Sequence, residues 1–343
     1  MRILLLGGTG FIGPFVARRL SAEGHEVTLF HRGQTQADLP FLIRRITGDR
    51  RELPLQRAAL ARLAPDVVLD MYAMTEAEAG AVVAVFAGAA GRIVAISSQD
   101  VYRAYGRLIR AEPGVPDPLP LTEDAPLREK LFPYRGETPL PADDPRHWTD
   151  DYDKILVERT YLGACDLPGT ILRLPMVYGP GDDQHRLFTY LKRMDDGRTT
   201  ILLGEHAARW RWTRGYVENV AAAIAQAATD ERAAGRVYNV GKEPALALAE
   251  WVRRIGAQAG WQGQVVTLPE ERLPAHLAVE LDLAQDLVAD TARLRTELGY
   301  REAVPQDEAL RRTIAWERAN PPAPVDPARF DYGAEDAALT GAD

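Results

Sequence analysis

Met1–Gly13 reads MRILLLGGTGFIG, and this stretch decides the fold. Ile3–Leu6 is an apolar run of strand length, glycines follow it at once, and from Phe15 onward the apolar residues recur at helical spacing. Gly8–Gly13 matches G-x-G-x-x-G, a pattern typical of dinucleotide-binding proteins. The stretch therefore predicts a strand, a tight turn and a helix whose N-terminus binds a pyrophosphate.

Glycine suits this turn for steric reasons. A Cβ atom would hinder the turn itself, the approach of a pyrophosphate, or the close packing of the helix on the strand. The free N–H groups and the positive dipole end of the helix then favour the phosphates. The alternative is a glycine-rich β–α turn in some other doubly wound protein. The residues predicted to line this cofactor site are Gly7, Thr9, Gly10, Phe11, Ile12 and Gly13.

The composition places the chain among soluble globular proteins. It has 343 residues, of which 46% are hydrophobic and 26% are charged, which suits one large or two moderate domains. A net charge of −8 disfavours a nucleic acid or an anionic membrane as the main partner. The single cysteine, Cys165, cannot form an intrachain disulfide, so we expect a reducing compartment, the cytoplasm. No apolar run reaches the roughly 18 residues that a membrane span needs.

Apolar runs of strand length alternate with helical stretches through the first half of the chain. This alternation implies a parallel sheet with right-handed crossovers. We therefore predict an α/β fold, a doubly wound parallel (Rossmann) sheet with a smaller mixed α/β substrate-binding lobe. The predicted strands after the first are 26–30, 42–47, 66–71, 92–98 and 170–177, and the predicted helices include 76–90, 154–164 and 186–194.

The domain boundaries follow from where this rhythm breaks. Residues 1–178 are predicted to form the dinucleotide-binding domain, with an insertion at 103–150 that is rich in proline and acidic residues. A loop of that length is often functional, so we expect a lid or substrate-side insertion, the alternative being a segment that only wraps the surface. The remaining assignments are a strand at 236–241 that returns to the first domain, a substrate-binding lobe at 179–235 and 242–325, and a loosely packed tail at 326–343.

The residues after the second and third strands bear on the choice of cofactor. An NAD site usually places an acidic residue after the second strand to bind the ribose hydroxyls, and this chain has none there. Arg32 offers instead a donor fork suited to a 2′-phosphate. We favour NADP(H), with NAD(H) as the second possibility and an exposed turn arginine as the alternative to both. Asp49 either accepts from the adenine amino group or simply belongs to a turn.

Later strand ends carry hydroxyl and charged groups. Ser97 and Ser98 end the strand 92–98 and face the expected ligand cleft. Three aspartates between residues 150 and 153 precede the helix that begins near Lys154, and acids favour a helix N-terminus. Lys154 and Glu158 are four residues apart and can pair along one helix face, which is the structural alternative for both.

Taken in order, these motifs resemble the extended short-chain dehydrogenase/reductases, the group that contains nucleotide-sugar epimerases and dehydratases. The likeness covers roughly residues 1–302. The matching segments are GGTGFIG at 7–13, GD at 48–49, SS at 97–98 with VY at 101–102, Lys154-x-x-x-Glu158, RLPMVYGPG at 173–181, VYNVG at 237–241 and LGY at 298–300.

The resemblance implies that Lys154 binds the nicotinamide ribose and lowers the pKa of a tyrosine, and that Ser98 hydrogen-bonds the same substrate oxygen as this tyrosine. The family's tyrosine position, four residues before the lysine, is occupied by Asp150, and the nearby tyrosine is Tyr152. Two residues turn about 200° on an ideal helix, so Tyr152 would face away from Lys154. Either the helix starts later and Tyr152 bends back to the cleft, or the usual acid/base is absent. An atypical branch that includes chloroplast stem-loop RNA-binding proteins has such a degenerate pattern.

The second lobe supports binding of a small molecule without naming it. Arginines at 186, 209, 211 and 214 are available to pair with phosphates, and Trp210 and Trp212 could stack on a base or sugar. The alternation at 209–212 equally suits a strand with packed tryptophans and solvated arginines. The further cofactor contacts that we expect are Met71, Ser97, Pro175 and Val177. The expected substrate contacts are Tyr72, Tyr102, Arg186, Arg211 and Tyr216.

Two functions remain open from the sequence. The first is an NAD(P)-dependent oxidoreductase or epimerase/dehydratase that acts on a hydroxyl or carbonyl group, with a nucleotide sugar as one candidate substrate and with Ser98, Lys154 and either Tyr152 or Asp150 as catalytic residues. The second is a nicotinamide-nucleotide-binding protein without turnover, a sensor or an RNA-associated protein. No metal site is predicted. The resemblance also implies a homodimer formed through the helix that carries Lys154.

Overall fold

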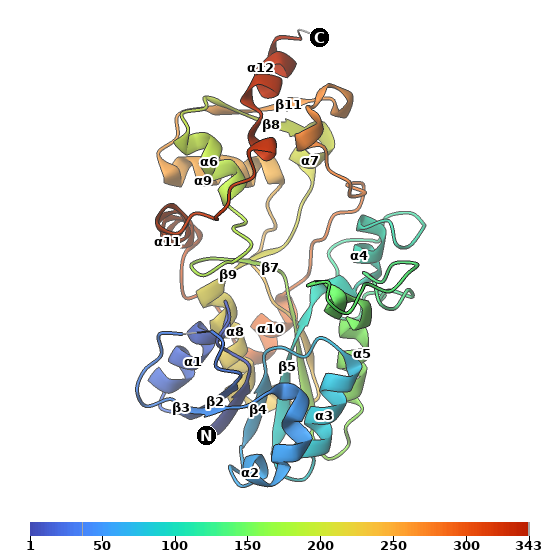
Figure 1. Ribbon diagram of the computed structural model, residues 1–343, viewed down its shortest axis with the longest axis vertical. Helices are drawn as coiled ribbons and strands as arrows, with labels where there is room; N and C mark the ends of the chain where they lie inside the picture. The colour runs from blue at the N-terminus through green and yellow to red at the C-terminus, as the bar shows by residue number, and fades with distance from the viewer. Residues whose placement is uncertain (36, 342–343) are drawn as a thin grey trace.

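The computed structural model describes residues 1–35 and 37–341. The molecule is elongated, with a larger lobe that contains the N-terminus at one end and a smaller lobe that ends in α12 at the other (Figure 1). Seven strands form one parallel sheet in the larger lobe, in the order β10-β6-β5-β4-β1-β2-β3. The predicted α/β fold with a Rossmann sheet is confirmed.

The elements of the larger lobe alternate as the sequence pattern indicates. The sheet strands are β1 (Arg2–Leu6), β2 (Glu26–His31), β3 (Arg44–Thr47), β4 (Val67–Asp70), β5 (Arg92–Ser98), β6 (Gly169–Leu174) and β10 (Val237–Asn239). The helices of this lobe are α1 (Gly13–Ala22), α2 (Arg57–Ala61), α3 (Glu76–Phe86), α4 (Arg103–Leu108), α5 (Lys154–Leu162), α8 (Val217–Thr229) and α10 (Ala292–Leu298).

The central strand β1 is buried on both faces of the sheet. Ile3 and Leu5 pack in one apolar cluster with side chains of α1 and α8. Leu4 and Leu6 pack in a second cluster with side chains of α3 and α5. Each of these buried side chains stabilises the fold by about 2 kcal/mol. The sheet order reverses between β1 and β4, which is where ligands bind in open parallel sheets, outside the carboxyl ends of the strands.

As far as the structure describes it, the smaller lobe contains two short parallel sheets and five helices. Its β7 and β9 lie at the junction between the lobes (Figure 1). The strand pairs are β7 (Met176–Tyr178) with β9 (Arg214–Tyr216) and β8 (Thr200–Gly204) with β11 (Gln264–Leu268). The helices are α6 (Phe188–Asp195), α7 (Glu205–Arg209), α9 (Leu248–Ala259) and α11 (Gln306–Ala319), and α12 (Tyr332–Thr340) follows near the C-terminus.

The strand predicted at 170–177 is wrong, because the structure divides it into two. β6 ends at Leu174, and β7 begins at Met176 in a different sheet. Pro175 between them has no N–H to donate, so a sheet ladder cannot continue through it. At this break the chain leaves the seven-stranded sheet and enters the junction between the two lobes. Some other predicted elements are longer than the observed ones, as at α3, which ends at Phe86 rather than at residue 90, whereas the strand predicted at 92–98 has the observed bounds of β5.

The tail is packed more firmly than its composition predicts. Its helix α12 carries Glu335, which is buried and forms an ion pair with buried Arg193 of α6 at 2.6 Å. A charged pair so far apart in sequence leaves no local pattern, so the sequence does not predict this contact, although the other described residues of the tail are exposed or half-buried. In the part of the chain that the structure describes, no helix is both long enough and apolar enough to cross a membrane.

Candidate active site

The opening glycine turn forms a space free of side chains at the end of β1. Gly7 and Gly8 have φ values of 83° and 97°, in the left-handed region that favours glycine. A Cβ atom on Gly13 would lie 2.1 Å from the Cα atom of Gly8, so α1 can approach the turn this closely only without one. A Cβ atom on Gly10 would meet nothing within 4 Å. Ile12 gives α1 no side-chain cap, so the leading N–H groups face this space and suit a pyrophosphate.

The neighbouring strand ends surround this turn. Met71 and Tyr72 lie against it, because a Cβ atom on Gly7 would be 3.6 Å and 3.4 Å from their Cβ atoms. From the second lobe, a Cβ atom on Gly181 would lie 3.5 Å from the Phe11 ring, so the loop after β7 approaches the same turn. Of the other residues expected to contact a cofactor, Thr9 is half-buried in the turn, Pro175 lies in the break between β6 and β7, and Val177 is buried in β7.

Arg32 and Asp49 lie at the ends of β2 and β3. Arg32 is exposed, and no acidic residue accompanies it at the end of β2. Asp49 accepts a hydrogen bond from the backbone N–H of Arg51 at 2.9 Å and pairs with its guanidinium at 2.6 Å. These bonds lower the pKa of Asp49 to about 2. The carboxylate of Asp49 is therefore occupied within its own turn, while Arg32 remains open to a phosphate.

Lys154 is buried at the start of α5, beside the carboxyl ends of β4 and β5. Its Nζ donates to the carbonyl oxygen of Ile96 in β5 at 3.1 Å and to that of Ala73, just beyond β4, at 2.5 Å. Burial lowers the pKa of Lys154 to about 8. Lys154 does not pair with Glu158, so the alternative interpretation, in which the two side chains only form an ion pair along the helix, is wrong for Lys154. An ammonium group that has no direct carboxylate partner among the described residues is thus held at the edge of the sheet where ligands bind.

Ser97 and Ser98 have different surroundings. The hydroxyl of Ser97 is buried and donates to Glu158 of α5 at 2.5 Å, and Glu158 also pairs with Arg173 at 2.7 Å. Ser97 therefore fastens α5 to β5, which corrects its assignment as a cofactor contact. Ser98 is only partly buried, and its Oγ accepts from the backbone N–H of Asp100 at 3.2 Å. Of the two hydroxyls, Ser98 is the one available to a ligand.

Tyr152 has the geometry of the first alternative, in which the helix starts late. Asp153 caps α5 by accepting from the N–H of Ile155 at 2.8 Å, and the helix begins at Lys154. Tyr152 is extended, with φ −68° and ψ 121°, so the helical rotation that would turn it away does not apply. Its hydroxyl donates to the carboxylate of Asp100 at 2.5 Å. Burial, together with the Asp100 carboxylate, raises the pKa of Tyr152 well above its usual value.

Asp100 is the residue that sequence reasoning missed. It is buried two positions after Ser98, beyond the carboxyl end of β5, and that position is the signal that could have found it. Asp150, the alternative acid/base, has another role. Its buried carboxylate accepts from the backbone N–H of Leu140 at 2.7 Å and so holds the insertion in place. Its other oxygen, Oδ1, is buried and has no hydrogen-bond partner within the described residues, and a catalytic role for Asp150 stays a prediction.

Two of the expected substrate contacts are buried. Tyr102 is fully buried, and its hydroxyl donates to Asn239 at 2.7 Å. Tyr216 is buried in β9, and its hydroxyl donates to Glu218 at 2.7 Å. Both hydroxyl groups are therefore engaged within the protein, and a substrate contact at either residue stays a prediction. Tyr72, by contrast, is half exposed beside the glycine turn.

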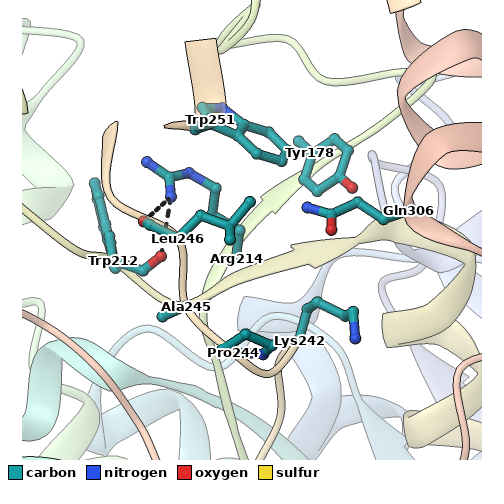
Figure 2. Close-up of a pocket in the computed structure, with 9 residues that line it drawn as sticks. All are labelled: Tyr178, Trp212, Arg214, Lys242, Pro244, Ala245, Leu246, Trp251 and Gln306. Carbon is teal, nitrogen blue, oxygen red and sulfur yellow. Dashed lines mark hydrogen bonds between the residues drawn. The ribbon is translucent and has the colours of Figure 1, made fainter. Parts of the chain in front are cut away.

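The arginines of the second lobe divide into paired and unpaired ones. Arg186 pairs with Asp182 at 2.5 Å, and Arg211 pairs with Asp286 at 2.8 Å, so neither is free to bind a phosphate as predicted. Arg214 is buried and has no salt bridge within residues 1–35 and 37–341. Its Nη1 instead donates to the carbonyl oxygens of Trp212 and Leu246, each at 3.2 Å (Figure 2). Burial lowers the pKa of Arg214 to about 10.

A small cavity surrounds Arg214 at the junction of the lobes. Its guanidinium lies 4.9 Å from the ring centre of Trp251, and Tyr178 packs edge-on against the same ring (Figure 2). Lys242 and Gln306 line the cavity as well. The cavity has room for about one water molecule, and the Nζ of Lys242 donates to the carbonyl oxygen of Glu243 at 2.6 Å.

The fold and the glycine turn define an extended short-chain dehydrogenase/reductase. Residues 3–104 and 150–241 match the model of the NAD dependent epimerase/dehydratase family, and the chain belongs to that family. The segment between the two matched parts, 105–149, coincides closely with the proline-rich stretch predicted as an insertion.

Individual relatives are distant. The chain is 27% identical to a 2'-dehydrokanamycin reductase from Streptomyces kanamyceticus, over 79% of this chain and 70% of the relative. It is also 27% identical to a 3-diazoavenalumate denitrifying reductase from a Streptomyces species, over 89% of this chain and 97% of the relative. Among solved structures, the UDP-glucose 4-epimerase of Thermotoga maritima matches with a TM-score of 0.67 and 18% identity, over 93% of this chain and 99% of that one. This structural match shows the fold.

Proposed function

We propose that this protein is an NADP(H)-dependent oxidoreductase that acts on a carbonyl or hydroxyl group of a small molecule carrying an anionic group. The observation that carries the proposal is the buried ammonium of Lys154, held by the carbonyl oxygens of Ile96 and Ala73 at the ligand-binding edge of the sheet. Burying a cation in this way opposes stability, so a function at that position is the better explanation.

Each part of the cofactor has a candidate partner. The side-chain-free turn at Gly10 would hold the pyrophosphate against the N-terminus of α1, Arg32 would bind a 2′-phosphate, and Lys154 would donate to the nicotinamide ribose. When bound, the nicotinamide supplies or accepts the hydride. Ser98 and Tyr152 would then orient the substrate oxygen, with Tyr152 moving the proton.

The substrate class rests on Arg214. Its buried guanidinium donates to the carbonyl oxygens of Trp212 and Leu246, so an anion that entered beside it would compensate its charge. The two curated relatives named as reductases support net reduction. The named epimerase among the structural matches keeps a nucleotide sugar as a candidate substrate.

The proposal is tested by titrating dialysed protein with NADPH and NADH, following cofactor fluorescence. We expect both to bind and NADPH to bind more tightly. Arg32→Ala should weaken the binding of NADPH by roughly tenfold or more, since a charge-assisted hydrogen bond is worth about 1.5–3 kcal/mol. The binding of NADH should be unchanged. Arg51→Ala is the matched control, because this nearby arginine is exposed and pairs with Asp49. Binding of neither nucleotide would overturn the proposal, and equal binding of both would overturn the choice of NADP(H).

A further inference from the structure

A chain of hydroxyl and carboxyl groups leads from Tyr152 toward the surface. The Tyr152 hydroxyl donates to Oδ2 of Asp100 at 2.5 Å. The hydroxyl of Tyr134 lies 3.4 Å from the same oxygen and 2.9 Å from the hydroxyl of Tyr105. The rings of Tyr134 and Tyr152 also pack together, with centroids 5.3 Å apart. Four oxygen-bearing side chains, from the turn after β5, from α4, from the loop that carries Tyr134 and from the residues before α5, therefore meet at one place.

The two ends of this chain differ in access to water. Asp100 and Tyr152 are each 6% exposed, whereas Tyr134 is 40% exposed. Tyr134 belongs to the insertion, which lies outside the two matched parts of the family model. The other carboxyl oxygen of Asp100, Oδ1, is buried and has no hydrogen-bond partner within the described residues. A buried carboxyl group with a free oxygen costs stability unless that oxygen is used.

We propose that Tyr134 and Asp100 form a proton path that connects Tyr152 with solvent and so equips the site for net reduction; the proposal rests on the proposed function. In reduction, a hydride from the nicotinamide forms the new C–H bond, and the carbonyl oxygen takes the proton of Tyr152. The Tyr152 oxygen then takes a proton from Asp100, and Asp100 takes one from water through Tyr134. One carbonyl, one reduced cofactor and one solvent proton give one alcohol and one oxidised cofactor.

The number of protons taken from solvent in each turnover distinguishes a reductase from an epimerase. An epimerase returns both hydride and proton to its substrate within one turnover, so it needs no proton from solvent. A reductase consumes one proton for each turnover, and a buried tyrosine without a relay would be replenished slowly. Closing the path requires the Tyr134 and Asp100 oxygens to move from 3.4 Å to the usual O–H···O distance of about 2.7 Å, a shift of about 0.7 Å.

The charged surroundings of Asp100 allow it to hold a proton. Burial raises its pKa above the usual carboxyl value, while the hydrogen bond from Tyr152 and the charges of Arg128 and Lys154 oppose that rise. The groups that face Asp100 are Tyr152, Tyr134 and Tyr105 from three elements, Arg128 from the insertion, and Lys154 and Asp153 from α5.

The path has a test that needs no substrate. We expect the infrared spectrum of the whole protein to show a buried protonated carboxyl band that is absent in Asp100→Asn. On transfer to D₂O this band should shift quickly in the unaltered protein and in Tyr332→Phe, a control at a half-buried tyrosine of α12 whose hydroxyl donates to Asp196 in the smaller lobe. The shift should be slower in Tyr134→Phe. A band that survives in Asp100→Asn, or an exchange rate that is the same in Tyr134→Phe, would overturn the proposal.

A second measurement separates this proposal from the proposed function. Asp100→Asn and Tyr134→Phe should bind NADPH as the unaltered protein does, which also shows that they fold. With a carbonyl that the unaltered protein reduces, each should lower kcat, Asp100→Asn by roughly 10²-fold, and leave KM nearly unchanged. Loss of NADPH binding in the unaltered protein would refute the proposed function. Normal binding with undiminished kcat in both variants would refute the proton path alone.

Discussion

Replacing Lys154 with methionine should make the free energy of unfolding respond differently to pH. Burial lowers the pKa of this lysine from an ordinary value of 10.5 to about 8 in the folded protein. A tenfold change in proton affinity is worth about 1.4 kcal/mol, so the charged lysine costs the folded state roughly 3 kcal/mol. Methionine has a similar length and no charge, so Lys154→Met removes this cost.

The direction of the effect follows from proton binding. Below pH 8 the lysine is charged in both states, and the full cost is present. Between pH 8 and 10.5 the unfolded chain keeps the proton while the folded protein loses it, so stability rises by about 1.4 kcal/mol for each pH unit. The unaltered protein should therefore gain roughly 3 kcal/mol relative to Lys154→Met between pH 7 and pH 10.5.

Urea denaturation of both proteins without cofactor, at half-unit steps from pH 7 to 10.5, measures this difference. Groups that titrate in both proteins cancel in the comparison. The hydrogen bonds to Ile96 and Ala73 that the variant loses shift the difference in unfolding free energy by a constant and do not change its dependence on pH. Lys130→Met is the matched control, because Lys130 is exposed, and its difference from the unaltered protein should stay flat. A flat difference for Lys154→Met would refute the reasoning that this ammonium is held at a cost to stability.

Three further changes test other parts of the structure. Gly10→Ala should fold normally but lose NADPH in a fluorescence titration, whereas Gly13→Ala should also melt at lower temperature, because only its Cβ would collide with the backbone of Gly8. Glu335→Gln should reduce the free energy of unfolding in urea by about 3 kcal/mol, because it leaves the Arg193 guanidinium buried without its charge partner. Arg214→Gln should weaken binding of inorganic pyrophosphate, measured by calorimetry with NADPH saturating, and should leave NADPH binding unchanged.

The sequence predicted the parts of this structure that depend on local pattern. The strand β1 alternates between two apolar clusters, and the glycines after it are required by close contacts within a few residues. Such features follow from neighbours along the chain, so the succession of strands and helices along the chain and the position of the turn could be predicted directly. The break at Pro175 was also readable, since proline has no N–H for a ladder.

The sequence could not pair charged residues that are far apart in the chain. Asp70 ends β4 and is completely buried, yet its partners Arg50 and Tyr161 come from a turn after β3 and from α5. Burial alone would raise the pKa of Asp70, but the Arg50 guanidinium and the Tyr161 hydroxyl lower it. Nothing in the composition shows that such residues are buried, and only the tertiary structure shows which charged residues pair with each other.

The same limit explains the candidate acid/base site. An ideal helix through Tyr152 would separate it from the cleft, and this inference fails because Asp153 caps the helix one residue later. The cap leaves Tyr152 in extended backbone, where its hydroxyl reaches Asp100. A tyrosine displaced by two positions can therefore approach the end of β5 if the helix starts later. Whether a displaced tyrosine retains an acid/base role in such a chain then depends on where the helix cap lies and on what the tyrosine meets there, rather than on the motif spacing alone.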